Sequence, residues 1–314
     1  MDKTMPQRGC DTMNSIYHSG ELKVQTRVGA NNAADSMSRT ILPVIAHVFV
    51  NFIQSQPMVI LGSVDVHGMV WASILCGAPG FMKVVDEQTL GIDAWPDESD
   101  PLRGNLREGS ELGLLVIDFL THRRLRVNGS VVTGPDGFSV RPRQVYSNCP
   151  RYIQSRELEM PNDISLSPRL TRQSDSLSVE LQQWIRRADT FFLASFHPVG
   201  GADASHRGGF PGFVQVVDER TLIWPDYNGN GIFNSLGNII ENPNTCLLFL
   251  DFKQGRIIQL SGTARIIWDK ERALSFPGAE RIIEFKILKV IETENATELR
   301  WKFLEYSSDN PWFC

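Results

Sequence analysis

Hydrophobic residues occur along the chain in short runs, separated by polar residues and by Gly, Pro or Asp turns. These runs are rich in Val, Ile, Leu and Phe, and their length predicts β-strands. Two segments instead space their apolar residues three or four positions apart, which predicts helices over 40–55 and 178–188. The predicted strands are 58–64, 70–75, 81–85, 90–92, 112–117 and 124–132 in the first half, and 191–196, 202–206, 213–217, 222–224, 246–250 and 256–267 in the second.

This pattern occurs twice because the sequence itself repeats. Residues 79–90 (PGFMKVVDEQTL) recur as 211–222 (PGFVQVVDERTL), 132 positions later, with nine of the twelve residues identical. After one inserted residue, an offset of 133 pairs Gly129 with Gly262. The chain is therefore an internal duplication.

Each copy is predicted to fold as an antiparallel β-barrel. Its strands follow one another closely with few helices between them, whereas a parallel sheet needs a helix between consecutive strands. The predicted fold class is mainly β with flanking α-helices. We expect the two antiparallel barrels to pack against each other as a pseudo-dimer, with a ligand crevice between them. The predicted boundaries are a disordered tail at 1–16, a first barrel at 17–150, a linker at 151–176 and a second barrel at 177–314.

Composition agrees with a folded chain and narrows the class of partner. The 314 residues are 42% hydrophobic with a net charge of −5, so we expect no nucleic-acid partner and no membrane partner. No apolar run is long enough to span a bilayer. The five cysteines are scattered without a Cys-x-x-Cys pair, which favours a cytoplasmic location, and the six histidines lack metal-ligand spacing, so we expect no metal site.

The two copies differ where polar chemistry would be placed. The second copy ends a strand with Ser-His-Arg-Gly at 205–208, whereas the first has Ser-Ile-Leu-Cys at 73–76. Arginine suits a phosphate group, and glycine allows close backbone approach to a ligand. A Gly- and Asn-rich loop at 225–231 then leads into a predicted helix at 232–241, while the matching loop at 93–101 is acidic. We therefore expect one functional pocket, built mainly by the second half.

These segments resemble the FMN-binding split-barrel family related to pyridoxamine 5′-phosphate oxidase. The similarity covers 205–213, 225–230, 235–243 and 247–250 in the second half, and 17–22, 59–63 and 144–154 in the first. The resemblance identifies the chain as a tandem member, either a pseudo-dimeric monomer or a homodimer. It implies an FMN-dependent oxidoreductase acting on a small-molecule substrate, with NAD(P)H or O₂ as candidate electron donor or acceptor.

The resemblance also implies which residues hold FMN. Arg207 and Ser205 correspond to groups that reach the flavin phosphate or ribityl chain, and Asn234 and Ser235 stand where the oxidases place a basic phosphate-binding pair. Because neither of the latter is cationic, phosphate binding would rest on Arg207, neutral donors and helix N–H groups. The predicted cofactor residues are Ser205, His206, Arg207, Gly208, Trp224, Asp226, Asn228, Asn230, Asn234, Ser235 and Gln259, and the predicted inter-barrel contributors are Arg126, Tyr146, Cys149 and Tyr152.

Two alternatives stay open at this point. A non-enzymatic flavin-binding protein, or a split barrel that binds haem or a deazaflavin, would share the same fold. The sequence contains no catalytic triad or paired-carboxylate motif, which agrees with chemistry carried by a cofactor, and no catalytic side chain is assigned. Cys149 is expected to pack against the crevice without reacting covalently.

Overall fold

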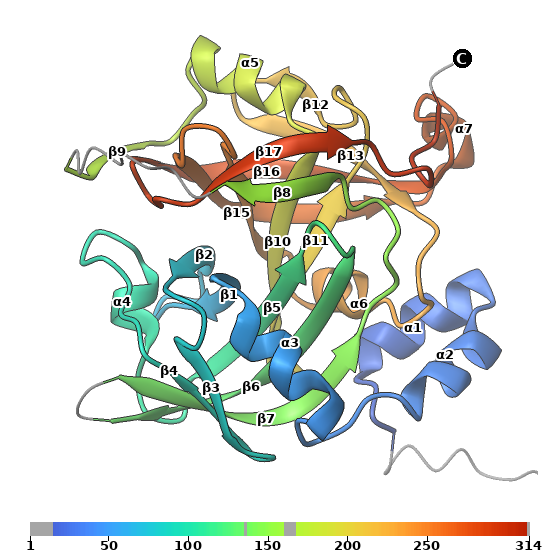
Figure 1. Ribbon diagram of the computed structural model, residues 1–314. Coiled ribbons are helices and arrows are strands. Elements are labelled where there is room, and N and C mark those ends of the chain that lie inside the picture. The colour runs from blue at the N-terminus through green and yellow to red at the C-terminus, as the bar shows by residue number, and fades with distance from the viewer. Residues whose placement is uncertain (1–14, 135–136, 160–167, 313–314) are drawn as a thin grey trace, which may run out of the picture.

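The computed structural model describes residues 15–134, 137–159 and 168–312 and contains two β-barrels (Figure 1). The strands of the first barrel are β1 (Met58–Val64), β2 (Val70–Cys76), β3 (Met82–Asp86), β4 (Thr89–Ile92), β5 (Glu111–Asp118), β6 (Arg123–Thr133) and β7 (Phe138–Ser147). Those of the second are β10 (Thr190–His197), β11 (Gly201–Gly208), β12 (Gln215–Asp218), β13 (Thr221–Tyr227), β14 (Asn244–Leu250), β15 (Ile257–Ile267) and β16 (Ala279–Glu294).

The two barrels have the same topology. The first sheet has the order β2-β1-β5-β6-β7-β4-β3, and the second has β11-β10-β14-β15-β16-β13-β12, which is the same order in the matching strands. The register agrees as well, since Ile60 pairs with Ile74 in the first barrel and Phe192 pairs with His206 in the second. The structure thus confirms the predicted fold class of two antiparallel split barrels.

The barrels pack against each other as a pseudo-dimer. Each has a hydrophobic core of its own, and a third cluster joins them by burying Ile60 and Leu115 of the first barrel with Phe192 and Leu248 of the second. The backbones approach so closely that a side chain on Gly113 of β5 would meet the backbone of β11.

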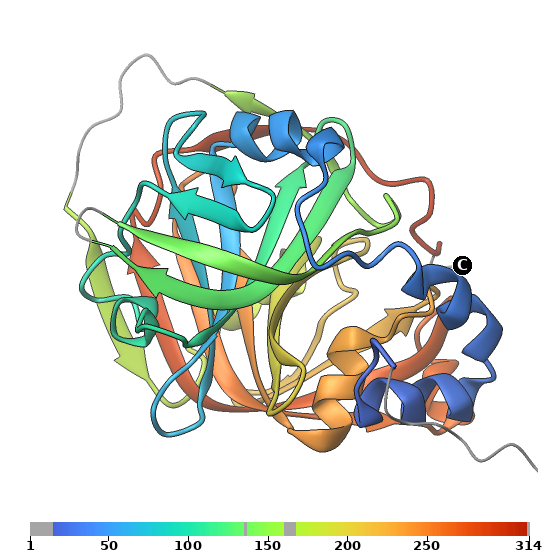
Figure 2. The same cartoon turned by 90° about the horizontal axis from the view of Figure 1, so that it is seen from below.

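Helix α1 (Ser19–Val28) packs on the second barrel, although the predicted first domain begins at 17. Figure 2 shows it beside α6 (Asn234–Glu241), the helix that follows β13. The Gln25 side chain donates a hydrogen bond to the Ile232 carbonyl at 3.0 Å, and Lys23 pairs with Glu241 at 2.7 Å. The N-terminal helix therefore supports a wall of the inter-barrel region.

Two predicted segments differ in the structure. The predicted helix over 40–55 is reduced to a 3-10 turn, η2 (His47–Phe49), and α3 (Val50–Ser55), because Pro43 disfavours helix before it and Leu42 instead forms a β-bridge with Val145. The predicted linker contains two strands, β8 (Ser155–Glu159), which pairs with β17 (Arg300–Glu305), and β9 (Leu170–Ser174), which pairs with β16.

The remaining elements are helices at the edges of the barrels. The helix predicted over 178–188 is present as α5 (Val179–Arg187), capped by the Ser178 side chain, which accepts a hydrogen bond from Leu181 N–H. The others are α2 (Asn31–Ser38), α4 (Leu102–Asn105) and α7 (Lys270–Ala273). In the part of the chain that the structure describes, no helix is both long and apolar enough to cross a membrane. Residues 1–14 of the predicted tail lie outside the described residues.

Candidate functional site

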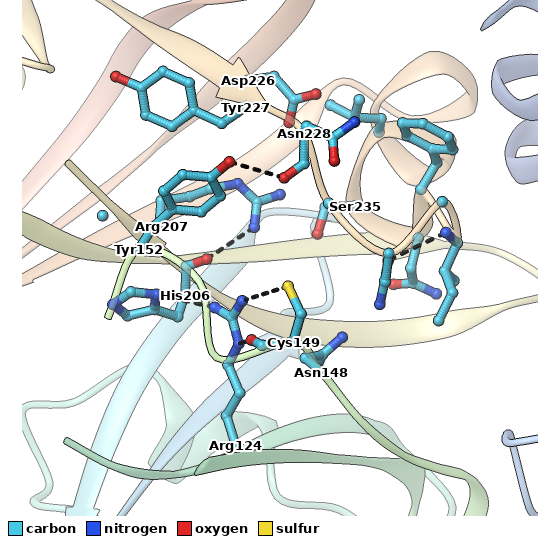
Figure 3. Close-up of a pocket in the computed structure, with 18 of the residues that line it drawn as sticks. Arg124, Asn148, Cys149, Tyr152, His206, Arg207, Asp226, Tyr227, Asn228 and Ser235 are labelled. Atoms are coloured by element: carbon cyan, nitrogen blue, oxygen red, sulfur yellow. Dashed lines mark hydrogen bonds between the residues drawn. The ribbon is translucent and has the colours of Figure 1, made fainter. Parts of the chain in front are cut away.

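A pocket lies between the two barrels (Figure 3). The first barrel contributes β6 and the segment that leaves β7. The second barrel contributes the end of β11, the end of β13 with the loop that follows it, and the first turn of α6. Both halves of the duplication are therefore needed to form its walls.

Arg207, near the end of β11, lines this pocket without a carboxylate partner. Its guanidinium donates to the Ser205 hydroxyl at 3.1 Å and to the His206 carbonyl at 3.0 Å. Both acceptors are neutral, and no Asp or Glu oxygen of the described residues lies within salt-bridge distance of it. Burial lowers the pKa of Arg207 from its ordinary value, with nearby Asp226 acting in the opposite direction. The pocket thus holds a cation whose charge is not neutralised by direct pairing.

Arg124 of β6 brings a second such cation from the first barrel. Its Nε donates to the Cys149 carbonyl at 2.9 Å, and its Nη1 lies 3.0 Å from Nδ1 of His206. Its Nη2 contacts the Cys149 sulfur at 3.6 Å. None of these groups is a carboxylate, and burial lowers the pKa of Arg124 to about 10. In Figure 3 the Arg124 and Arg207 side chains approach each other from opposite barrels.

Arg126, the third arginine of the pocket, is neutralised within the protein. Its Nη1 lies 3.0 Å from both oxygens of Asp203, which also accepts from Asn128 at 3.2 Å and from the Ser235 hydroxyl at 3.2 Å. Burial opposes the charge on Arg126, but Asp203 and Tyr146 outweigh it and raise its pKa. The Arg126–Asp203 pair is a buried link between the barrels at the wall of the pocket.

The segment 148–152, which we call the strap, connects the first barrel to the loop after β13. The Tyr152 hydroxyl donates to the Asn228 carbonyl at 3.0 Å, and Arg151 donates to the Asn228 side chain at 3.0 Å. The rings of Tyr152 and Tyr227 lie 5.1 Å apart. The strap and the loop therefore hold each other in place along one side of the pocket.

The loop between β13 and α6 is shaped by its own polar groups. Asp226 is buried and lies 3.4 Å from Nη1 of Arg281, and burial raises its pKa despite that partner. The Asn230 side chain accepts from Ile232 N–H at 3.2 Å, as an asparagine in a turn often does. Asn234 donates to Glu21 of α1 at 3.1 Å. The loop thus presents backbone and amide groups to the pocket.

Several buried polar atoms around the pocket have no hydrogen-bond partner among the described residues. They are Nε of Arg126, Oδ1 of Asn148, Oδ1 of Asn234 and Nε2 of His206. Unpaired buried polar atoms are rare and call for an explanation, because each loses its bonds to water. A polar ligand bound in the pocket would supply hydrogen-bond partners for those of these atoms that face it.

The structure places most of the predicted site residues together. Those that line the pocket are His206, Arg207, Gly208, Asp226, Asn228, Asn230, Asn234, Ser235, Arg126, Tyr146, Cys149 and Tyr152. Ser205 lies directly behind it and bonds to Arg207 and Ser235. The sequence reasoning missed Arg124, Asn148, Tyr227 and Phe233 in the same walls.

Two predicted residues lie elsewhere, and their assignment to the pocket is wrong. Trp224 is 1% exposed and packs in the second barrel core against Phe191 and Phe285, because its side chain points to the inner face of β13. Gln259 is on β15 and donates to the Ala72 carbonyl of the first barrel at 2.8 Å. It therefore belongs to the opposite side of the barrel interface.

Gln259 marks the counterpart of the pocket in the first barrel, which the chain fills with its own groups. The Ser73 hydroxyl donates to Asp100 at 2.6 Å, and Gln259 lies 3.4 Å from the same carboxylate. Leu102 N–H also donates to Asp100, at 2.9 Å. At the positions of His206, Arg207 and Arg124, the repeat has Ile74, Leu75 and Ile257. The duplicated positions therefore carry no cation on that side.

One family model matches the second barrel. Residues 177–300 match the model described as pyridoxamine 5′-phosphate oxidase, and no curated protein sequence gives a significant match. Similar solved structures include HupZ from group A Streptococcus, with 14% identity, 42% of this chain and 98% of that chain covered, and a TM-score of 0.30. An FMN-binding protein from Syntrophomonas wolfei shows 14% identity, with 36% and 86% covered and a TM-score of 0.27.

Proposed function

We propose that this chain, whose residues 177–300 match the family model described as pyridoxamine 5′-phosphate oxidase, binds FMN between its two barrels and serves as an FMN-dependent oxidoreductase. The observation that carries the proposal is the presence of two arginines, Arg124 and Arg207, in one pocket without carboxylate partners. Both guanidiniums are partly buried, and a cation that loses part of its water without gaining an anion is costly, so such a pocket favours an anionic ligand.

The residues around the pocket fit a phosphorylated aromatic ring system. Arginine forks match phosphate oxygens in geometry and charge. The unpaired Nε of Arg126 and Oδ1 atoms of Asn148 and Asn234 supply a donor and two acceptors for a polar heterocycle. Tyr146, Phe213, Tyr227 and Phe233 give the pocket aromatic walls. The pocket thus combines positive charge, hydrogen-bonding groups and apolar surface, as small-molecule binding sites usually do.

Each part of the chain has a separate task in this proposal. Arg207 and the adjoining neutral donors bind the phosphate, and the buried Arg126–Asp203 pair fixes the relative position of the barrels. The strap and the loop after β13 limit access of water along one side. When bound, FMN would supply the redox chemistry for a small-molecule substrate, with NAD(P)H or O₂ as the proposed electron donor or acceptor.

Absorption and reduction of the purified protein test the proposal. We expect flavin bands in the visible spectrum after addition of FMN and removal of the excess. We also expect bleaching by NADH or NADPH without oxygen, and return of the bands in air. Flavin bands that dithionite bleaches but no nicotinamide nucleotide does would favour a non-enzymatic flavin carrier, and a Soret band with bound haem would favour the haem alternative.

A further inference from the structure

The proposed phosphate site of the second barrel lacks the basic pair that the family resemblance implies. Asn234 and Ser235 occupy those positions and are neutral, and both are committed to other groups. Asn234 donates to Glu21, and the Ser235 hydroxyl bonds to Asp203 and Ser205. Within the second barrel, Arg207 is then the pocket-lining cation.

Arg124 reaches the same pocket from the first barrel. Burial, and then the positive charges of Arg126 and Arg207, lower the pKa of Arg124, as expected for cations that face one space. The groups that hold Arg124 in place are the carbonyls of Cys149 and Arg151, the Cys149 sulfur and the His206 ring. All of them orient the guanidinium without supplying a carboxylate, so its charge is available to a ligand.

His206 is suited to orient Arg124. A guanidinium can only donate, so Nδ1 of His206 must accept the bond at 3.0 Å and the ring must be neutral. Burial and the charges of Arg124, Arg207 and Arg156 keep the pKa of His206 well below its ordinary value. The ring is 3% exposed and its edges lie near Phe119 and Phe192. The histidine is thereby fixed as an acceptor.

The other half of the duplication shows that the fold itself does not need these groups. The counterparts of Arg124 and His206 are Ile257 and Ile74, and both isoleucines are buried in the same shared core. The barrel thus forms with aliphatic residues at these positions. An arginine and a histidine in the copy with the open pocket indicate a role in ligand binding.

We infer that Arg124 supplies the second cation for the phosphate group, that His206 positions it, and that the phosphate therefore joins the two barrels. The identification of the ligand as FMN rests on the proposed function. The chemistry recognised is a phosphate monoester, and the same site would accept a free inorganic phosphate or pyrophosphate more weakly.

The test compares FMN with riboflavin, which lacks the phosphate, by titration of flavin fluorescence. In the Arg124→Gln variant, we expect FMN binding to weaken about 10- to 100-fold, as for a lost charged hydrogen bond, and riboflavin binding to change by less than about twofold. The matched control is Arg123→Gln, which removes the same charge from the neighbouring exposed position and should leave both affinities unchanged. Equal FMN binding by Arg124→Gln and the wild type would overturn the inference.

The role of His206 is tested with two variants. His206→Asn keeps an acceptor near Nδ1 and should retain most of the FMN affinity, whereas His206→Leu should weaken it. If His206 acts through Arg124, His206→Leu causes no further loss when Arg124 is already Gln. Additive losses in the double variant would contradict the positioning role.

A pyrophosphate arm separates this inference from the proposed function. If the wild type binds neither flavin, the proposed function fails, and thermal stabilisation by pyrophosphate then decides the inference. Stabilisation that Arg124→Gln and Arg207→Gln each reduce would support it. Stabilisation that does not depend on Arg124, or no stabilisation at all, would overturn it.

Discussion

Arg126 of the first barrel, which lines the inter-barrel pocket, and Asp203 of the second form a buried ion pair with an N–O distance of 3.0 Å. Asp203 is 1% exposed and receives further bonds from Asn128 and Ser235. A buried carboxylate that loses its cation is left uncompensated, so the pair bears on stability more than on ligand affinity.

We predict that Arg126→Ala lowers the free energy of unfolding by about 3 to 5 kcal/mol, because Asp203 would keep its burial and lose its charge partner. Urea denaturation followed by tryptophan fluorescence measures this. The control Arg123→Ala removes an exposed arginine of the same strand that lies over Phe52, and should cost less than about 1 kcal/mol. Similar free energies of unfolding for the two variants would show that the Arg126–Asp203 pair does not stabilise the fold.

Arg207 should contribute to ligand binding and not to stability. In Arg207→Ala, we expect FMN affinity to fall about 10- to 100-fold, since a charged hydrogen-bond donor to the phosphate is removed. Arg187→Ala, on the exposed face of α5, is the matched control. Isothermal titration with FMN measures both, and an Arg207 variant that retains the wild-type affinity would refute the assigned role.

Gly208 should be required for the position of the strap. A Cβ atom there would meet the Tyr152 carbonyl, which is rigid backbone and cannot move alone. We therefore expect Gly208→Ala to displace the strap and to destabilise the fold by about 1 to 3 kcal/mol, as overpacking does. In Gly104→Ala, where a Cβ meets nothing within 4 Å, stability should be unchanged or slightly higher. A Gly208→Ala variant as stable as Gly104→Ala, with unchanged FMN affinity, would contradict this.

Glu21 should make stability depend on pH. The carboxyl is 1% exposed, and burial raises its pKa from 4.5 to about 7, against the hydrogen bonds from His18 and Asn234. Between these two pH values the folded state keeps a proton that the unfolded state releases, so the stability that Glu21 contributes is lost as pH rises towards 7.

The variant Glu21→Gln cannot ionise and isolates this effect. Its free energy of unfolding relative to the wild type should rise by up to about 3 kcal/mol as the pH increases from below 4.5 to above 7. Parallel urea denaturation series for the two proteins across this range give the difference. A difference that stays constant with pH would rule out the raised pKa.

The sequence was sufficient to predict the fold. Short apolar runs between turn residues indicate strands locally, and the internal repeat shows that the same set of strands occurs twice. Two strands of the barrels escaped prediction, β7 and β16, since charged residues such as Arg141 and Lys286 interrupt their apolar pattern. The helix α6 and the loop before it were predicted from the Gly and Asn residues at 228–231.

The site was predicted less completely, because it depends on contacts between the barrels. Arg124 occupies a strand where an arginine looks like a surface residue, and only its proximity to His206, 82 residues away, reveals its place in the pocket. Trp224 was misassigned because its position before a polar loop does not show that its side chain faces the barrel core. Local sequence does not determine which face of a strand meets another domain.

The number of FMN molecules bound per chain tests the central claim most directly. Ser73 and Gln259 already bond to Asp100 in the counterpart of the pocket, and that side has Leu75 where the second copy has Arg207. Titration of the purified chain with FMN, followed by flavin fluorescence, should therefore saturate at one equivalent, and Arg207→Ala should weaken that single event. Absence of FMN binding, or saturation at two equivalents per chain, would contradict a single phosphate-binding pocket formed by both barrels.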